Sequence, residues 1–488
     1  MPSGLAKIYS NLIDGRWVTS SRGATFASIN PADTAEVLGY FQQATSDEAR
    51  EAIEAARAAQ PAWAATPPSK RAELLYLVAE LMESHAAEWA ELLTREEGKT
   101  LAESTFEIKR AVANWRFYAN QAYLISGDTL PSDEPGVFLY TVREPLGVIS
   151  VITPWNFPVT IPTRKIAPAL VAGNTVVFKP ASLTPLMGIK IGEVLVEAGC
   201  PNGVFNVLTG PASAIGPELI SNPHVSAVTF TGSWDVGDQI QHRVATTCRT
   251  QLEMGGKNPI VVLEDADMDL AVACTVQGAF GMTGQSCTAT SRAIVVRAVL
   301  EQYVEKLVRA TKQLVIGNGL QEGVKVGPVA DSYQEKTILS YVELGKQEGA
   351  ELLHGGRKLD GDGFDRGYFI EPTIFGRVRP HMRIAQEEIF GPVLSILEVS
   401  DFDEAIHVAN DVEYGLSASI CTRDLNRAQR FAQMINAGMV KVNQPTTGVA
   451  INAPFGGVKK SSTDTFREQG QVAMQFFTRL KTVSVKFR

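Results

Sequence analysis

The sequence predicts an α/β fold with two parallel sheets in series, each built from strand–helix–strand units. From about residue 146 onward, short apolar runs rich in β-branched residues alternate with helical stretches, which is typical of parallel sheets. The length of 488 residues exceeds a single compact core, so two or three domains are expected. A composition of 45% hydrophobic and 20% charged residues is that of an ordinary globular α/β protein.

The first part of the chain, to about residue 125, is expected to hold a short strand region followed by helices. One helix is predicted to begin at Ser46 and to end near Pro61. A second is predicted to follow Pro67 and to stop near Gly98. Their apolar stripes indicate core faces and nothing more.

Candidate strands and helices alternate after this region. The candidate strands are 146–153, 174–180, 226–232 and 259–263, with helical composition at 187–198 and 235–246, and a second alternating block runs from 291–297 past 415–422. The segment 136–147 is predicted to form an extended hairpin arm, and 482–487 a closing edge strand. Such strands pair with another subunit or fold back on their own sheet, and the sequence leaves both open.

Charge and hydropathy exclude several classes of protein. A net charge of −8 argues against a general nucleic-acid binder. No run of 18 apolar residues predicts a membrane span, and residues 1–15 lack the charged head and apolar core of a secretory signal. We therefore expect a soluble, cytoplasmic protein. The five cysteines and six histidines show no spacing typical of a disulfide framework or a metal site.

Cys287 is the candidate nucleophile. It lies in the polar, glycine-led stretch 284–290, and a reactive thiolate needs access and nearby hydrogen-bond donors. Because a buried cysteine is more often a small hydrophobic side chain, the local sequence leaves both interpretations open.

Two further residues have side chains that suit acyl chemistry. Glu253 precedes Gly255-Gly256, a turn expected to leave its carboxylate in an accessible loop. A carboxylate there can take a proton from the water that hydrolyses a thioester, although it can equally be a surface acid. Asn156, between two prolines after a candidate strand, is a suitable donor to an oxyanion, a contact worth about 2.7–4 kcal/mol. The alternative is an ordinary proline-rich turn.

The signals for a cofactor are individually weak. The chain lacks a GxGxxG motif, but residues 230–237 place a glycine turn between a strand and a helix, where phosphates bind. Lys179 ends another candidate strand. Glu388 and Phe390 offer an acid and an aromatic ring at a turn, which suit a ribose and a flat base.

Taken in order, the motifs PWNFP, KPAS, FTGS, LEMGGKNP, GQSC, EEIFGPV and PFGGVK resemble those of the aldehyde dehydrogenase superfamily over nearly the whole chain. The resemblance implies three parts in each subunit of a homodimer or homotetramer. These are a dinucleotide-binding domain (1–123 and 147–255), a catalytic domain (256–460) and an oligomerisation arm (124–146 and 470–488).

The resemblance also implies a mechanism. Cys287 would attack the aldehyde, Asn156 and the Cys287 N–H would hold the oxyanion, and Glu253 would activate the hydrolytic water. The residues it assigns to the cofactor are Thr153, Trp155, Lys179, Ser182, Gly232, Ser233, Glu388 and Phe390. Ser182 stands where NAD-preferring members commonly carry an acid, which favours NADP while leaving NAD usable.

For the substrate, Arg164 and Arg292 match positions that hold the carboxylate in succinate-semialdehyde dehydrogenases. Two converging arginines favour a short carboxylated aldehyde, although either can instead be a structural ion-pair partner. The stretch GQSCTATSR and the C-terminal segment look closest to 2-oxoglutarate semialdehyde (2,5-dioxopentanoate) dehydrogenases. The loop 446–452 and Ser461-Ser462 depart from the succinate-semialdehyde pattern.

The sequence also leaves several alternative functions to be considered. Succinate-semialdehyde oxidation and a broader aldehyde dehydrogenase activity are the near alternatives. A member that passes the acyl group to coenzyme A would lack Glu253, and a non-catalytic protein on this fold would have lost its nucleophile.

Overall fold

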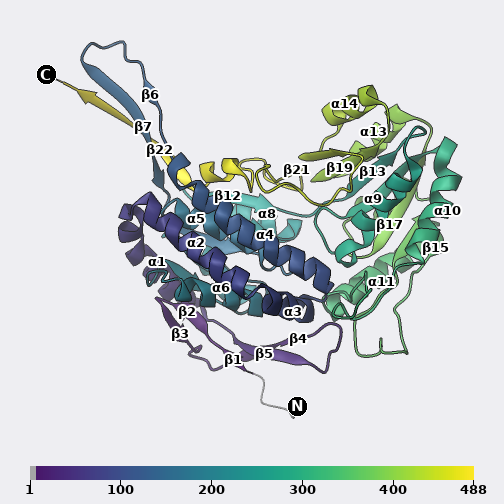
Figure 1. The fold of residues 1–488 in the computed structure, drawn as a ribbon, viewed down its shortest axis with the longest axis horizontal. Helices are drawn as coiled ribbons and strands as arrows, with labels where there is room; N and C mark the ends of the chain where they lie inside the picture. The colour runs from purple at the N-terminus through teal and green to yellow at the C-terminus, as the bar shows by residue number, and fades with distance from the viewer. Residues whose placement is uncertain (1–6, 488) are drawn as a thin grey trace.

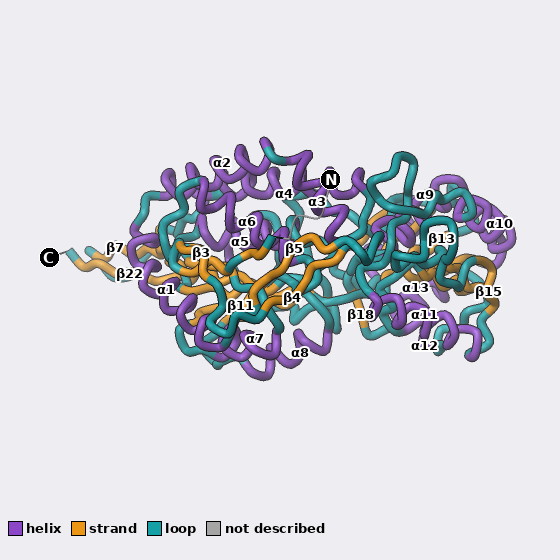
Figure 2. Tube along the Cα trace, turned by 90° about the horizontal axis from the view of Figure 1, so that it is seen from below, coloured by secondary structure: helices purple, strands orange, loops and turns teal. Residues whose placement is uncertain are grey.

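The computed structural model describes residues 7–487. Two α/β halves lie side by side along the long axis of the molecule, and a narrow arm of strands projects from one end (Figures 1 and 2). Residues 1–6 and 488, which belong to the N-terminal segment and the arm discussed above, lie outside the described residues. Among residues 7–487, no helix is both long and apolar enough to span a bilayer.

The first half is built on a seven-stranded sheet in the order β12-β11-β8-β9-β10-β2-β3. Its strands are β2 (Asn11–Ile13), β3 (Arg16–Val18), β8 (Val148–Ile152), β9 (Thr175–Lys179), β10 (Phe205–Val207), β11 (Val225–Thr231) and β12 (Arg249–Glu253). The strands from β12 to β10 run parallel, as predicted. The edge strands β2 and β3, from the N-terminal region, are antiparallel.

Helices cover both faces of this sheet, and a small sheet lies beside it (Figure 1). The helices are α1 (Ser46–Ala65), α2 (Pro68–Ser84), α3 (Ala86–Glu97), α4 (Leu101–Asn120), α5 (Thr160–Val171), α6 (Pro185–Glu197), α7 (Ala212–Ser221) and α8 (Trp234–Arg243), with the 3-10 turn η1 (Ala122–Leu124). The small sheet contains β1 (Ile8–Tyr9), β5 (Val37–Gln42) and β4 (Thr25–Ile29).

The predicted boundaries of the first helices are partly wrong. Helix α1 continues through Pro61 to Ala65. Pro61 and Arg57 lie on its exposed face, where water can satisfy the carbonyl that loses its donor, and buried Trp63 anchors the last turn by donating to the Leu170 carbonyl. The second predicted helix is two helices divided at His85. The stop at Gly98 is confirmed, because this glycine ends α3 in the left-handed conformation.

The second half contains the other seven-stranded sheet, in the order β15-β16-β17-β14-β13-β19-β20. Its strands are β13 (Asn258–Val262), β14 (Thr290–Val296), β15 (Glu351–His354), β16 (Thr373–Gly376), β17 (Val393–Val399), β19 (Ser417–Cys421) and β20 (Met439–Val442). All of these run parallel except β15 at the edge. The predicted fold of two parallel-sheet α/β units is therefore confirmed, and the antiparallel pairings of these two sheets lie at one end of each.

The remaining elements of the second half surround this sheet. The helices are α9 (Met268–Phe280), α10 (Leu300–Thr311), α11 (Ser332–Gln347), α12 (Arg383–Gln386), α13 (Phe402–Asn410) and α14 (Leu425–Met434), with the 3-10 turns η2 (Gly281–Gly284) and η3 (Arg297–Val299). The 3-10 turn η4 (Gln471–Gln475) packs instead against the core of the first half. The short strands β18 (Tyr414–Gly415) and β21 (Val458–Lys459) pair with each other.

The projecting arm joins two segments far apart in the sequence. Strand β7 (Val137–Pro145) pairs antiparallel with β22 (Thr478–Lys486) along its whole length, and with β6 (Thr129–Leu130) at its outer end. The expected hairpin within 136–147 is therefore wrong. No glycine, asparagine or aspartate lies between Gly136 and Gly147 to allow a turn, so the segment stays one strand and takes its partners from outside.

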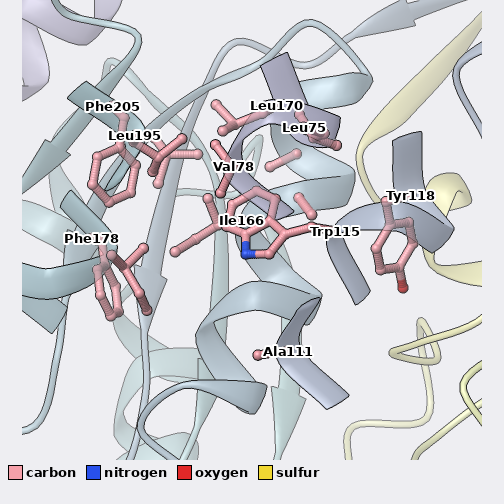
Figure 3. Close-up of a cluster of buried hydrophobic side chains, with 14 of the residues drawn as sticks. Leu75, Val78, Ala111, Trp115, Tyr118, Ile166, Leu170, Phe178, Leu195 and Phe205 are labelled. Carbon is pink, nitrogen blue, oxygen red and sulfur yellow. The ribbon is translucent and has the colours of Figure 1, made fainter. Parts of the chain in front are cut away.

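A large apolar core fixes helices α2, α4 and α5 against the first sheet (Figure 3). Trp115 of α4 is fully buried near Ile166 and Leu170 of α5. Burial of such side chains contributes about 1.5–3 kcal/mol each. This packing holds α4 and α5 in a fixed relation, which matters because both helices contribute side chains to the site described next.

Candidate active site

Four parallel strands of the first sheet end together at one edge. The register pairs Ile152 with Lys179 and with Phe230, and Thr231 with Glu253. Because all these strands run in the same direction, the residues that follow them are neighbours at the carboxyl edge of the sheet. The structure thereby brings Thr153, Lys179, Gly232 and Glu253 to one edge.

Cys287 faces this edge from the second half of the molecule. It lies half-buried in the turn after η2 and lines a cavity of about 450 Å³, a size suited to a small-molecule ligand. The other walls include Phe157 after β8, Arg164 of α5, Arg110 of α4 and Phe455. The cavity is therefore assembled from both halves of the chain.

The main chain around Cys287 is held by Asn258, a residue that the sequence analysis missed. The Asn258 amide donates to the carbonyls of Cys287 and Ala289, both at 2.9 Å, and its oxygen accepts from the Ser417 N–H. A Cβ at Gly256 would lie 2.8 Å from the Cys287 carbonyl oxygen. Gly256 and Asn258 of the GGKN motif thus shape the turn that carries Cys287. This motif is the sequence feature from which the role of Asn258 could have been predicted.

The pKa of the Cys287 thiol depends on burial and on the charged candidate residues around it. Burial raises the pKa of its thiol to about 12, Arg164 opposes this shift, and the carboxyl groups of Glu388, Glu253 and Glu468 reinforce it. The thiol is therefore protonated at rest near neutral pH, and a nucleophilic attack requires that its proton be removed.

Hydrogen bonds hold both the side chain and the main chain of Asn156 beside the turn that carries Cys287. Its side-chain amide donates to the Gln285 carbonyl at 2.9 Å, and its main-chain carbonyl accepts from Lys99 Nζ at 2.6 Å. An amide nitrogen carries two hydrogens, so one remains for a ligand. The buried Asn156 side chain thus stands where it can donate next to Cys287.

Lys99 and Glu107 support this arrangement, and neither was predicted. Lys99 Nζ lies 2.5 Å from Glu107 Oε2. The other Glu107 oxygen accepts from the N–H groups of Val159 and Thr160, at 2.9 and 3.0 Å. This buried ion pair therefore fixes both the Asn156 carbonyl and the first turn of α5.

Glu253 is the last residue of β12 and is only 1% exposed, so the expectation of an accessible loop is wrong. The strand carries it inward to the sheet edge. Oε1 lies 3.5 Å from the Ser462 hydroxyl, and Oε2 has no hydrogen-bond partner within residues 7–487. Burial, together with the negative charge of Glu468, raises the Glu253 pKa well above its usual range.

A second carboxylate, Glu468, binds two cations of α5. Its Oε1 accepts from Arg164 Nε and Lys165 Nζ, both at 3.0 Å. Burial alone would raise the Glu468 pKa, but these two cations outweigh burial and lower it. The sequence analysis missed both Lys165 and Glu468, whose contact spans about three hundred residues of chain.

Arg164 has the position predicted for it, at the cavity wall. Its guanidinium carbon lies 4.4 Å from the centre of the Phe455 ring. Only its Nε has a hydrogen-bond partner in the described part of the chain, so the two terminal nitrogens are available to a ligand in the cavity.

Arg292 does not converge on the same cavity, and this prediction is wrong. Its side chain is fully buried, and its nitrogens donate to the carbonyls of Lys257, Val408 and Ala409 at 2.9–3.0 Å. Val408 and Ala409 lie in the last turn of α13, where carbonyls lack helical partners and attract cations. Arg292 is therefore occupied in capping a helix.

Arg110 lines the cavity from α4 and was not predicted. Its Nη2 donates to the Val449 carbonyl at 2.5 Å and to Gln469 Oε1 at 3.2 Å. Burial and the charge of Arg164 lower the Arg110 pKa to about 10. Because α4 is sequence-remote from every motif, no local signal pointed to this residue.

The residues assigned to the cofactor form a partly unsatisfied polar edge. The buried hydroxyls of Thr153 and Thr231 have no hydrogen-bond partner in the part of the chain that the structure describes. Lys179 Nζ donates to the Pro180 carbonyl, and burial lowers its pKa to about 8. Ser233 is the exposed N-cap of α8. Free donors at a helix start and at a sheet edge fit the phosphates and riboses of a dinucleotide.

The second half presents two more of the assigned residues to this edge. The rings of Trp155 and Phe390 meet edge to face at 5.4 Å. Glu388 Oε1 accepts from the Gly256 N–H at 2.9 Å, and burial raises the Glu388 pKa to about 7. Phe390 adopts a positive φ of 57°, a conformation that marks a constrained functional turn.

Comparisons with known proteins agree with this arrangement. Residues 17–483 match the aldehyde dehydrogenase family. The chain is 47% identical to the alpha-ketoglutaric semialdehyde dehydrogenase of Bacillus subtilis, over 98% of each chain. It is 46% identical to the 2,5-dioxopentanoate dehydrogenase of Saccharolobus solfataricus, over 98% of this chain and 99% of that one.

Solved structures show the same fold. The betaine aldehyde dehydrogenase of Staphylococcus aureus in complex with NAD+ superposes with a TM-score of 0.95 at 34% identity, covering 98% of this chain and 95% of that one. An NADP dependent enzyme of E. coli superposes with a TM-score of 0.94 at 36% identity, covering 99% and 98%.

Proposed function

The chain belongs to the aldehyde dehydrogenase family, as its ordered motifs predicted, and we propose that its substrate is 2-oxoglutarate semialdehyde (2,5-dioxopentanoate). The observation that carries the proposal is the shared cavity of Cys287 and Arg164. A thiol at one wall and a guanidinium at another suit a molecule with an aldehyde at one end and a carboxylate at the other. Two relatives at 46–47% identity are named after this aldehyde.

In the first step, Cys287 Sγ bonds to the aldehyde carbon and the carbonyl oxygen becomes an oxyanion. The free hydrogen of the Asn156 amide and the Cys287 N–H stabilise it, a contribution of about 2.7–4 kcal/mol per donor. The thiol proton must leave as the bond forms. Water carries this proton to solvent, so that the Glu253 carboxylate stays free for the hydrolytic step.

The cofactor is held at the polar edge of the first sheet. We assign the riboses to Lys179, Ser182 and Glu388, and the pyrophosphate to Trp155, Gly232 and Ser233. Thr153 offers its unpartnered hydroxyl, and Phe390 borders the nicotinamide. When bound at this edge, NAD(P)+ would supply the hydride acceptor for conversion of the Cys287 thiohemiacetal into a thioester.

NADP is the proposed preference, with NAD also usable. Ser182 is exposed, and its hydroxyl donates to the Gly210 carbonyl at 3.2 Å. A serine there, with the Lys179 cation at the end of β9 just before it in the chain, accommodates a 2′-phosphate that an acid would repel.

Hydrolysis of the thioester completes the cycle. Glu253 Oε2 is free of protein partners in the described chain and can take a proton from the attacking water. The water oxygen bonds to the acyl carbon, the carbon–sulfur bond breaks, and Cys287 leaves as the thiolate. The Glu468–Lys165 pair tunes Glu253 electrostatically, since both groups shift its pKa.

Assembly and location are part of the proposal. We assign the arm of β7 and β22 to contacts within a homodimer or homotetramer, because it projects from the body and exposes Phe138 and Leu480. A cytoplasmic location suits five cysteines that are all free thiols, since reducing compartments keep thiols unpaired.

A panel assay tests the substrate class. Formation of NADPH and NADH is measured with 2,5-dioxopentanoate, succinate semialdehyde and pentanal. The proposal expects kcat/KM to be highest for 2,5-dioxopentanoate and lowest for the neutral pentanal. Equal or faster oxidation of pentanal, or formation of an acyl-CoA when coenzyme A is added, would contradict it.

A further inference from the structure

Arg110 and Arg164 enter the same cavity from two adjacent helices. Arg110 lies on α4 and Arg164 on α5, and both line the space in front of Cys287. The core around Trp115 packs these helices against each other. The two guanidinium groups therefore hold a fixed relation that does not depend on a mobile loop.

Arg110 has no carboxylate partner among residues 7–487. The lining carboxylates are already engaged: Glu107 by Lys99 and two amides, and Glu103 by Thr100 and the Met282 N–H. Glu468 is shared between Arg164 and Lys165. Of the oxygens in the described residues, Arg110 donates only to neutral ones.

The neighbours of Arg110 add to this imbalance instead of offsetting it. Burial and then the charge of Arg164 lower the Arg110 pKa, and burial and then the charge of Arg110 lower that of Lys441. Within the described part of the chain, Lys441 itself donates only to the carbonyls of Thr447 and Gly448. Like charges held together are unfavourable, and an anion between them relieves the repulsion.

The free donors of Arg110 are also oriented in advance. Its Nη2 is fixed by Val449 and Gln469, and Gln469 in turn donates to the carbonyls of Ala450 and Ala453. Nε and Nη1 of Arg110 have no hydrogen-bond partner in the chain as described. A planar guanidinium with two free donors matches the two oxygens of a carboxylate.

We propose that Arg110 is a specificity-determining residue and that the acid end of the substrate binds between Arg110 and Arg164. Arg110 takes the role expected of Arg292, which is occupied in capping α13. The inference rests on the proposed function, since it concerns the carboxylate of the aldehyde that Cys287 oxidises.

The competing role for Arg110 is that of a tether for the loop at 447–453. The variants Arg110→Met and Arg110→Gln separate the two roles, because glutamine removes the charge but keeps a donor for the Val449 carbonyl. Lys109→Met is the matched control, since Lys109 is the adjacent, exposed cation on α4. Melting temperatures identify any variant that does not fold.

Steady-state kinetics with 2,5-dioxopentanoate and with pentanal give the result. Both Arg110 variants should raise KM for the carboxylated aldehyde about ten- to hundred-fold, the range for losing hydrogen bonds to a charged group. They should leave kcat/KM for pentanal within about two-fold, and Lys109→Met should change neither. Glutarate, a dicarboxylate without an aldehyde, should inhibit the wild type competitively and lose at least ten-fold in affinity in both Arg110 variants.

Three outcomes overturn the inference or its premise, and they differ from one another. If the wild type prefers pentanal, the proposed function fails. If the wild type prefers the carboxylated aldehyde and the Arg110 variants keep both that preference and glutarate binding, the role of Arg110 fails alone. If Arg110→Met weakens both substrates equally while Arg110→Gln restores both, Arg110 is only a tether.

Discussion

The side-chain amide of Asn156 donates to the main-chain carbonyl of Gln285 at 2.9 Å, two residues before Cys287. This contact joins the loop after β8, in the first half of the molecule, to the nucleophile turn in the second. The donor assigned to the oxyanion and the thiol that generates it are thus held together before any substrate binds. Such preorganisation is what makes a hydrogen-bond donor effective in a transition state.

Replacing Asn156 by alanine should therefore lower kcat about 100- to 1000-fold, because one oxyanion donor is lost. KM should change much less, since the ground-state carbonyl needs the donor less. Steady-state kinetics with circular dichroism as a folding control check this. A loss below about five-fold in a folded variant would show that Asn156 does not serve the oxyanion.

The rate of acyl-enzyme hydrolysis should rise with pH above the range in which an ordinary carboxyl group titrates. A base acts when deprotonated, and burial with the Glu468 charge raises the Glu253 pKa well above that of an ordinary carboxyl group. The carboxyl is therefore protonated at low pH and becomes active as pH increases through its raised pKa. Single-turnover decay of the acyl-enzyme isolates this step from the thiol. A rate whose pH midpoint equals that of an ordinary carboxyl group would contradict the assignment.

Arg292→Met should act on stability and not on substrate choice. The arginine donates to three buried carbonyls, two of them in the last turn of α13, and buried carbonyls left without donors are destabilising by about 1–3 kcal/mol each. We expect a lower melting temperature and an unchanged ratio of kcat/KM for 2,5-dioxopentanoate over pentanal. A selective rise in KM for the carboxylated aldehyde would restore Arg292 to the substrate site.

Ser182→Asp should move cofactor preference from NADP towards NAD. An aspartate can accept from the ribose 2′-OH of NAD, whereas it repels the 2′-phosphate of NADP. The ratio of kcat/KM with NAD to that with NADP should rise at least ten-fold, measured at saturating aldehyde. Ser182→Asn is the uncharged control. An unchanged ratio would place the 2′-group away from Ser182.

Local sequence predicts the strands and turns whose conformation is determined by neighbouring residues. The runs at 174–180 and 226–232 became β9 and β11 because continuous β-branched stretches favour buried parallel strands. Cys287, Glu253 and Asn156 stand beside glycines or prolines that shape tight turns, and such turns are visible as motifs. The carboxyl edge of the sheet then brings separate motifs together.

The structural features that the local sequence did not predict depend on partners far along the chain. Strand β7 pairs with β22, more than three hundred residues away. Arg292 finds its acceptors in α13, 116 and 117 residues later, and its charge alone does not distinguish a helix cap from a substrate site. Arg110 belongs to α4, which lies beyond the two predicted helices and outside every motif, so its approach to Arg164 follows from helix packing.

The most direct test of the account is the covalent intermediate on Cys287. The Glu253→Gln variant is mixed with 2,5-dioxopentanoate and NADP+, quenched in acid, and analysed by intact mass spectrometry and peptide mapping. Because the thioester forms but its hydrolysis lacks a base, we predict an acyl adduct on Cys287 and a burst of NADPH of about one equivalent per subunit. The Cys287→Ala form should show neither. An adduct on another residue, or steady turnover by Cys287→Ala, would contradict the central claim.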